Sequence, residues 1–268
     1  MTSRAAESAP ERTVGDTSRR VLITGAASGL GKALADRFEA RGDRVLRTDL
    51  TPGSDVKLDI TRDEDWAAAR DHVQKIWGGL DVLVNNAGVA GGGRLDVAGL
   101  DEWQWITEIN LFGAVRGTAT FTPIFKEQGG GTFVNVASLA GLVHPAGMAS
   151  YNAVKAAVVA LTETTGHELA AYGVTAHVVC PSYFRTNLMS SVQGKDAALS
   201  ATLSKLVDES PTSADDIAAA VLEGLDRGDE VIIPDEAAQM AVDLKRTDRA
   251  TYDTVMRAQA AKLDRSAP

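Results

Sequence analysis

Short runs of β-branched and aliphatic residues alternate with longer segments of helical spacing along most of this chain. Such alternation predicts a parallel sheet with helices on both faces. Because the strands of such a sheet are buried on both faces, they read as continuous apolar runs, as VLIT and VLVN do here. The sequence therefore predicts an α/β fold built on a doubly wound, mostly parallel sheet of seven strands. The predicted strands are Val21–Thr24, Val45–Thr48, Val56–Leu58, Val82–Val84, Thr132–Val136, Thr175–Val179 and Glu230–Ile233.

Length and composition agree with one domain. The chain has 268 residues, of which 44 % are hydrophobic and 24 % are charged, as is ordinary for a soluble globular protein. Since no internal repeat or linker interrupts them, residues 19–268 are expected to form a single domain with an outer helical segment after about residue 234. Residues 1–18 are small and polar, without the apolar run of a secretory signal, and we expect a disordered tail there.

Charge, hydropathy and cysteine content limit the classes of partner and the location expected for this chain. The net charge of −9 disfavours a nucleic acid or an anionic membrane surface as partner. No window of 18 apolar residues occurs, so no membrane span is expected. Cys180 is the single cysteine, which fits a reducing, cytoplasmic location and a place in the core rather than a nucleophile's role. The histidines have no ligand spacing, so we expect no metal site; they are His72, His144, His167 and His177.

A glycine-rich turn follows the first predicted strand. The segment TGAASGLG, residues 24–31, places Gly25, Gly29 and Gly31 between this strand and an amphipathic helix. Glycines in such a turn permit a tight bend, close approach of backbone to a phosphate, and packing of helix on strand. The helix that begins near Ser28 would direct its N-terminal N–H groups at a pyrophosphate. The turn therefore predicts a dinucleotide site.

Two acids follow the second and third predicted strands. Asp49 lies eighteen residues after Gly31, where a carboxylate can accept hydrogen bonds from an adenosine ribose. Asp59, in LDI, is a weaker candidate for a contact beside the adenine, and a solvated loop acid is the alternative interpretation of both residues.

The spacing of these glycines resembles the short-chain dehydrogenase/reductase family, and further motifs agree. NNAG at Asn85–Gly88 follows the fourth predicted strand, and Asn110 lies in EINLFG. Ser138 ends the fifth strand, and YNAVK begins thirteen residues later at Tyr151. CPSYFRT at Cys180–Thr186 is similar to the family's segment at the nicotinamide, and the match runs from roughly residue 20 to residue 234.

This resemblance implies a Rossmann fold and an NAD-preferring enzyme. It implies that Asn110, Ser138, Tyr151 and Lys155 are catalytic, with Ser138 holding the substrate oxygen and Asn110 holding a water that links Lys155 to solvent. The residues expected to bind NAD are Gly25, Ser28, Gly29, Leu30, Gly31, Asp49, Leu50, Asp59, Ile60, Asn86, Ala87, Gly88, Tyr151, Lys155, Pro181, Phe184 and Thr186.

Tyr151 and Lys155 are four residues apart and share a face of the predicted helix. An ammonium ~5 Å from a phenolate stabilises it by ~3 kcal/mol at an effective dielectric near 20. That corresponds to roughly two pKa units. We therefore expect the pKa of Tyr151 to fall, so that the residue acts as general base in alcohol oxidation and as general acid in carbonyl reduction.

Two residues depart from the family pattern. Ser182 replaces the usual glycine after Pro181, so the backbone there is expected to turn differently. Val154 stands where a serine is common, and we expect it to face packing.

Hydride transfer between NAD(H) and a secondary alcohol or ketone is the favoured function. A catalytically silent NAD(H)-binding sensor or scaffold is the alternative, although both Tyr151 and Lys155 are present. Dehydratase or epimerase chemistry is less favoured because the chain after residue 234 is short. The substrate cannot be identified from sequence. Its predicted contacts weakly favour a lipophilic molecule, and they include Leu142, Val143, Met148, Tyr183, Phe184, Leu188 and Met189. His144 has two interpretations that the sequence leaves open, an exposed loop residue and a substrate contact.

Two further expectations concern cofactor choice and assembly. Asp49 would repel the extra phosphate of NADP, and the place that holds a basic residue in many relatives is Ser28. Arg47 should share the face of Asp49 but sit further back.

The segments Trp103–Gln128 and Tyr151–Ala171 carry apolar residues beyond one buried stripe, which predicts a homodimer or homotetramer. The examples are Ile106, Ile109, Ala114, Ala157, Val158 and Leu161.

Overall fold

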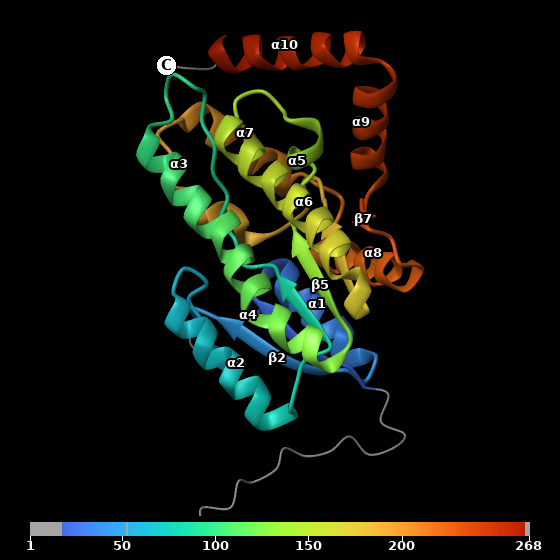
Figure 1. The fold of residues 1–268 in the computed structure, drawn as a ribbon. Helices are drawn as coiled ribbons and strands as arrows, with labels where there is room; N and C mark the ends of the chain where they lie inside the picture. Colours follow the sequence, from blue (N-terminus) through green and yellow to red (C-terminus); the bar gives the residue numbers. More distant parts are fainter. Residues whose placement is uncertain (1–17, 52, 266–268) are drawn as a thin grey trace, which may run out of the picture.

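The computed structural model describes residues 18–51 and 53–265, in which seven parallel strands form one sheet (Figure 1). The strand order is β3-β2-β1-β4-β5-β6-β7, and every neighbouring pair is parallel. The doubly wound parallel sheet predicted from the sequence is thus confirmed. Residues 1–17 of the predicted tail lie outside the described residues. The strands are β1 (Arg20–Thr24), β2 (Arg44–Asp49), β3 (Val56–Lys57), β4 (Val82–Asn85), β5 (Gly131–Val136), β6 (Val174–Val179) and β7 (Val231–Ile232).

Helices cover both faces of the sheet because successive strand residues point to opposite sides. On one face, Val21 and Ile23 of β1 belong to a buried cluster with residues of α1 (Gly29–Ala40) and α8 (Ala214–Arg227). On the other, Leu22 belongs to a cluster with Trp66 and Phe121. These two side chains come from α2 (Asp63–Trp77) and α4 (Gly113–Gln128). The other helices before residue 234 are α3 (Leu100–Thr107), α5 (Ala140–Val143), α6 (Ala149–Leu169) and α7 (Ala197–Asp208), with shorter turns η1 (Glu108–Phe112), η2 (Ala170–Tyr172) and η3 (Asn187–Ser191).

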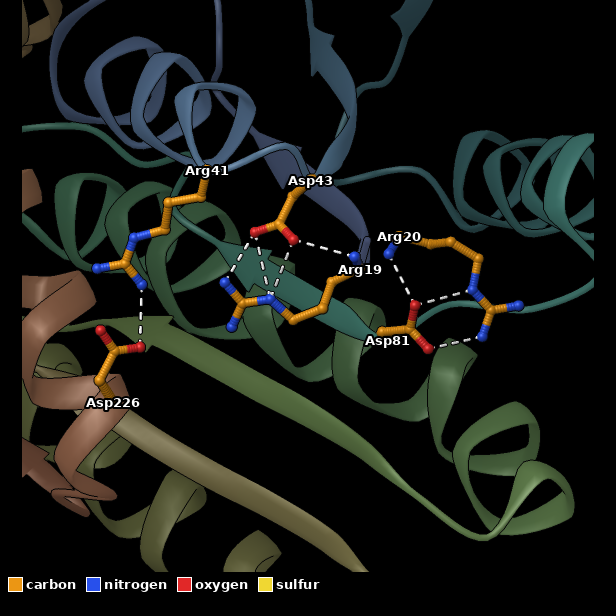
Figure 2. Close-up of polar contacts among 6 residues, drawn as sticks. All are labelled: Arg19, Arg20, Arg41, Asp43, Asp81 and Asp226. Carbon is orange, nitrogen blue, oxygen red and sulfur yellow. Dashed lines mark hydrogen bonds and ion pairs between the residues drawn. The ribbon is translucent and has the colours of Figure 1, made fainter. Parts of the chain in front are cut away.

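Ion pairs fix the amino-terminal edge of the sheet (Figure 2). Arg19 and Asp43 pair through the guanidinium at 2.7 Å, and the Arg19 backbone N–H donates to the same carboxylate. Arg20 makes a similar two-pronged contact with Asp81, just before β4. Bidentate pairs of this kind set geometry as well as energy. They hold the starts of β1, β2 and β4 in register, at the opposite edge from the strand ends that carry the predicted site.

The strand order reverses between β1 and β4. At such a point the loops that leave the two strands diverge to opposite faces, and a crevice opens at the carboxyl ends of the strands. The glycine-rich turn leaves β1 here, and the NNAG segment leaves β4. The fold thus brings the two predicted cofactor motifs to one place.

Two helices end the described chain. α9 (Glu236–Thr247) runs up one side of the molecule, and α10 (Arg249–Arg265) crosses its end, above α7 and toward α3 (Figure 1). Among the described residues, none of the helices combines the length and apolar character needed to span a bilayer.

Candidate active site

A cavity of about 670 Å³ opens at the carboxyl ends of the strands. It brings together residues from the glycine-rich turn, the NNAG segment, the end of β5, α6 and the loop after β6. Of the residues expected to bind the cofactor, all but Gly31 line it. Of those expected to be catalytic, Ser138, Tyr151 and Lys155 line it and Asn110 does not.

The glycine-rich turn has the geometry of a phosphate cradle. Gly25 and Gly29 have φ of +67° and +53°, a region that favours glycine. A Cβ on Gly31 would lie 2.2 Å from the Gly25 carbonyl oxygen, so this glycine permits helix-on-strand packing rather than ligand contact. Ser28, before the first turn of α1, makes no side-chain cap, and the first N–H groups of α1 therefore stay available to an anion. The residues present fit a dinucleotide.

Asp49 lines the cavity, and hydrogen bonds hold its carboxylate in place. Its oxygens accept hydrogen bonds from the Ala27 N–H at 3.1 Å and from the Thr51 N–H and hydroxyl at 3.0 and 2.5 Å. Burial alone would raise the pKa of Asp49, but the Thr51 and backbone donors outweigh it and lower that pKa. Asp49 is therefore an anion at neutral pH.

Arg47 is a candidate to balance the charge of Asp49, but it pairs with other acids. Its guanidinium pairs with Asp36 at 2.7 Å and with Glu39 at 2.9 Å, both on α1. Asp59 also lines the cavity, where its carboxylate accepts hydrogen bonds from the Thr61 N–H and hydroxyl. The end of the cavity where the adenosine is expected thus carries two anchored acids.

Ser138, Tyr151 and Lys155, which the sequence predicts to be catalytic and which are here called the reactive group, lie together in the cavity. The Ser138 side chain hydrogen-bonds the Tyr151 phenol and accepts the Ala140 N–H at 3.1 Å. The Lys155 ammonium donates to the Val136 carbonyl at 3.0 Å and lies 5.7 Å from the centroid of the Tyr151 ring. A proton donor, a hydroxyl that orients it and a cation therefore meet on one wall of the cavity.

The expectation that Lys155 lowers the pKa of Tyr151 is wrong for the protein without cofactor. Burial raises the pKa of Tyr151 to about 12, and the Ser138 hydrogen bond opposes this only in part. Burial also lowers the pKa of Lys155 to about 8. Desolvation disfavours the charged form of each group and is the main cause of both shifts.

Asn110 occupies a π-helical stretch, η1, between α3 and α4 rather than a regular helix. Its carboxamide accepts the Val89 N–H at 2.8 Å and donates to the Val89 carbonyl at 2.9 Å. A Cβ on Gly88 would come within 2.7 Å of the Asn110 oxygen. This geometry makes Asn110 a positioning residue for the loop after β4, and its link to Lys155 stays a prediction.

Sequence reasoning missed Thr24. Its hydroxyl accepts the N–H groups of Asn86 and Ala87, both at 3.0 Å, while the Asn86 amide donates to the Thr24 carbonyl at 2.8 Å. The glycine-rich turn and the NNAG segment are thus joined directly. A threonine at the end of a buried strand was the available signal.

Val154 and Ser182 are the two residues that depart from the family pattern, and the structure shows the contacts of each. Val154 is buried in a cluster with Tyr151, which confirms the expectation of packing. Ser182 hydrogen-bonds Asp235 through its N–H at 3.0 Å and its hydroxyl at 2.8 Å. Cys180 is fully buried, as expected, and burial raises the pKa of its thiol to about 12.

The substrate half of the cavity is mainly apolar. Most residues proposed from sequence line it, namely Val143, Met148, Tyr183, Phe184, Leu188 and Met189. Leu142 and His144 do not. His144 instead bonds the Gly141 carbonyl and Lys245, and it adopts a φ of +58°. Val207 and Gln259, which no sequence motif marks, also line the cavity.

Comparison with known proteins finds relatives of one family. A family model described as short chain dehydrogenase matches residues 19–197. The chain is 34 % identical over 189 residues to 2-(R)-hydroxypropyl-CoM dehydrogenase of Xanthobacter autotrophicus, an alignment covering 63 % of this chain and 76 % of the relative.

Solved structures share the fold. A short chain dehydrogenase/reductase from Burkholderia phymatum, in complex with NAD, superposes with a TM-score of 0.80 at 28 % identity, covering 87 % of this chain and 95 % of the other. One from Burkholderia cenocepacia, in complex with NADP, gives 0.76 at 27 % identity over 89 % and 97 %. Because the family model spans more than half of its length, this chain belongs to the short chain dehydrogenase family.

Proposed function

We propose that this protein transfers a hydride between NAD(H) and a lipophilic secondary alcohol or ketone. As a short chain dehydrogenase it is an oxidoreductase that uses a nicotinamide cofactor on an alcohol or carbonyl group. The observation that carries the proposal is that Ser138, Tyr151 and Lys155 line the same cavity as the glycine-rich cradle.

Each residue has a separate task. When bound, the nicotinamide supplies or accepts the hydride. The Tyr151 hydroxyl gives a proton to the substrate oxygen in reduction and removes it in oxidation. Ser138 orients that hydroxyl through the hydrogen bond between them. Lys155 places a positive charge beside the ring, which favours the phenolate when Tyr151 has lost its proton.

Electrostatics at the adenosine end support NAD rather than NADP. Asp49 is an anchored anion, and Arg47 is paired with two acids of α1. Among the described residues that line the cavity, Lys155 is the only lysine or arginine. A ribose phosphate would therefore meet a carboxylate without a cation to offset it.

Turnover can be tested with the purified chain. It is mixed with NAD or NADP and a panel of apolar secondary alcohols, and reduced nicotinamide is followed by absorbance. Faster formation with NAD and an apolar alcohol is the expected result. Tight binding of NAD with no turnover of any alcohol, or of any ketone with NADH, would instead favour the silent sensor.

A further inference from the structure

The helices α9 and α10, here called the roof, lie along one side and across one end of the molecule (Figure 1), and Gln259 of α10 lines the cavity. Leu263 of α10 is buried in one cluster with Met148 and with Leu199 and Leu203 of α7. A Cβ on Gly147 would lie 2.7 Å from the Leu263 side chain, so α10 packs closely against the loop before α6.

Polar contacts join this roof to α5 and to the loop after β4. Lys245 donates to the Leu142 carbonyl, and Tyr252 donates to the Val143 carbonyl. Near the other end of α10, Asp264 lies 3.6 Å from Arg94, in the loop after β4. These contacts dock the two helices on the rest of the protein.

Gln259 breaks the apolar character of the inner face of α10. Tyr252, Met256, Gln259 and Leu263 follow each other at helical spacing and share one face. Tyr252 and Leu263 are only 5 % and 4 % exposed, so this face points inward. Gln259 lies between them, and it is the residue through which α10 reaches the cavity.

The Gln259 carboxamide has no hydrogen-bond partner in the described part of the protein, although it can donate two hydrogen bonds and accept others. The side chain is partly exposed and lines the cavity, so its amide is accessible to a polar group of a ligand. The cavity also lacks a second cation among its described lining residues, because Lys155 belongs to the reactive group. A carboxylate, sulfonate or phosphate on the substrate would have no counter-charge there.

We propose that Gln259 hydrogen-bonds a second, neutral polar group of the substrate, distinct from the oxygen held at Ser138 and Tyr151. The substrate is then a secondary alcohol or ketone with an apolar body and a further hydroxyl, carbonyl or amide. This inference rests on the proposed function and deepens it.

The test compares two ring ketones of the same carbon skeleton, one with a second carbonyl at the far end and one with a methylene there. With NADH, the intact chain should reduce the diketone with about tenfold higher kcat/KM, mainly through a lower KM, as one hydrogen bond allows. Gln259→Leu should lose this preference, so that it reduces the two ketones with similar kcat/KM. Gln239→Leu, on the exposed face of α9, is the matched control.

A second variant and a binding measurement separate the outcomes. Gln259→Glu places an acceptor-only group, so it should favour a far hydroxyl over a far carbonyl. Calorimetry with the same pair measures recognition without turnover. If neither ketone is reduced but the preference in binding depends on Gln259, the proposed function fails and the recognition site stands. Equal kcat/KM and equal binding of both ketones in the intact chain would overturn the role of Gln259.

Discussion

Ser182 and Asp235 are joined by two hydrogen bonds, from the serine N–H at 3.0 Å and from its hydroxyl at 2.8 Å. Asp235 also accepts the Ala238 N–H at 2.8 Å and so caps the first turn of α9. The loop expected at the nicotinamide is thus tied to α9, the first helix of the roof. A glycine, the residue usual in the family at this place, could make only the backbone bond.

Replacing Ser182 with Ala removes the hydroxyl bond and keeps the backbone bond. Because the acceptor is a carboxyl oxygen at a partly exposed site, the free energy of unfolding should fall by about 1–2 kcal/mol. Chemical denaturation measures this change. Thr254→Ala, whose hydroxyl bonds only within exposed α10, should stay within about 0.5 kcal/mol of the unaltered chain. Equal losses of unfolding free energy in both variants would show that the Ser182–Asp235 hydrogen bond stabilises the protein no more than an exposed helical one.

Replacing Tyr151 with Phe keeps the buried ring and removes the proton carrier. Turnover should fall by ~10²–10⁴-fold, the usual contribution of a general acid–base group. Binding of NAD, measured by calorimetry, should persist because the glycine-rich cradle is unchanged. Near-normal turnover on a good substrate would rule out the role given to Tyr151.

The parts of this site that could be predicted are those set by neighbours in sequence. The turn at Gly25–Gly31 follows directly from a strand that meets a helix, and the positions of Tyr151 and Lys155 follow from helical spacing. The high pKa of Tyr151 could not be foreseen, because it depends on how completely the folded chain removes water from the phenol. Gln259 was missed for a similar reason, since only the docking of Leu263 near Met148 brings α10 to the cavity.

His144 should make stability depend on pH. Burial, then the charges of Lys245 and Arg249, lower the pKa of His144, while the Gly141 carbonyl opposes them. The unfolded chain therefore takes up the proton first, at about pH 6.5. Stability is then unaffected well above that pH and falls as the pH drops through it toward the lower folded pKa.

The measurement is the free energy of unfolding between about pH 7.5 and pH 5.5. His144→Asn should lose less stability on acidification than the unaltered chain, and asparagine tolerates the φ of +58° at this position. His167→Asn, at an exposed site on α6, should keep the full dependence. An identical pH profile for all three proteins would contradict this role of His144.

Association should occur through the outer face of the long helices. Ile106, Ala114 and Val158, offered from sequence as interface residues, are instead buried within the protomer. Phe112 remains 45 % exposed, and Leu161 is partly exposed. We still expect a homodimer or homotetramer, by burial of this face. Light scattering at micromolar concentration should show it, and Phe112→Ser should weaken it. A monomer under these conditions would refute the expectation.

The choice of cofactor should follow the charge of Asp49. The carboxylate is held by Ala27 and Thr51 in a position to accept hydrogen bonds from a free ribose hydroxyl, and it would repel a phosphate there. Arg47 does not offset it, because Asp36 and Glu39 hold the guanidinium. At this partly solvated rim we expect a preference for NAD of ~1–3 kcal/mol. That is roughly 5- to 150-fold in affinity.

Asp49→Ala should narrow this preference, chiefly by improving NADP binding, and Asp49→Asn should do so while keeping the size of the side chain. Dissociation constants for both cofactors, measured by calorimetry on the three proteins, give the comparison. Asp226→Asn, remote at the α1–α8 contact, is the control and should leave the ratio unchanged. If the intact chain bound NADP as tightly as NAD, the carboxylate of Asp49 could not be the group that faces the adenosine ribose. If only the alanine variant changed the ratio, lost volume rather than lost charge would be the cause.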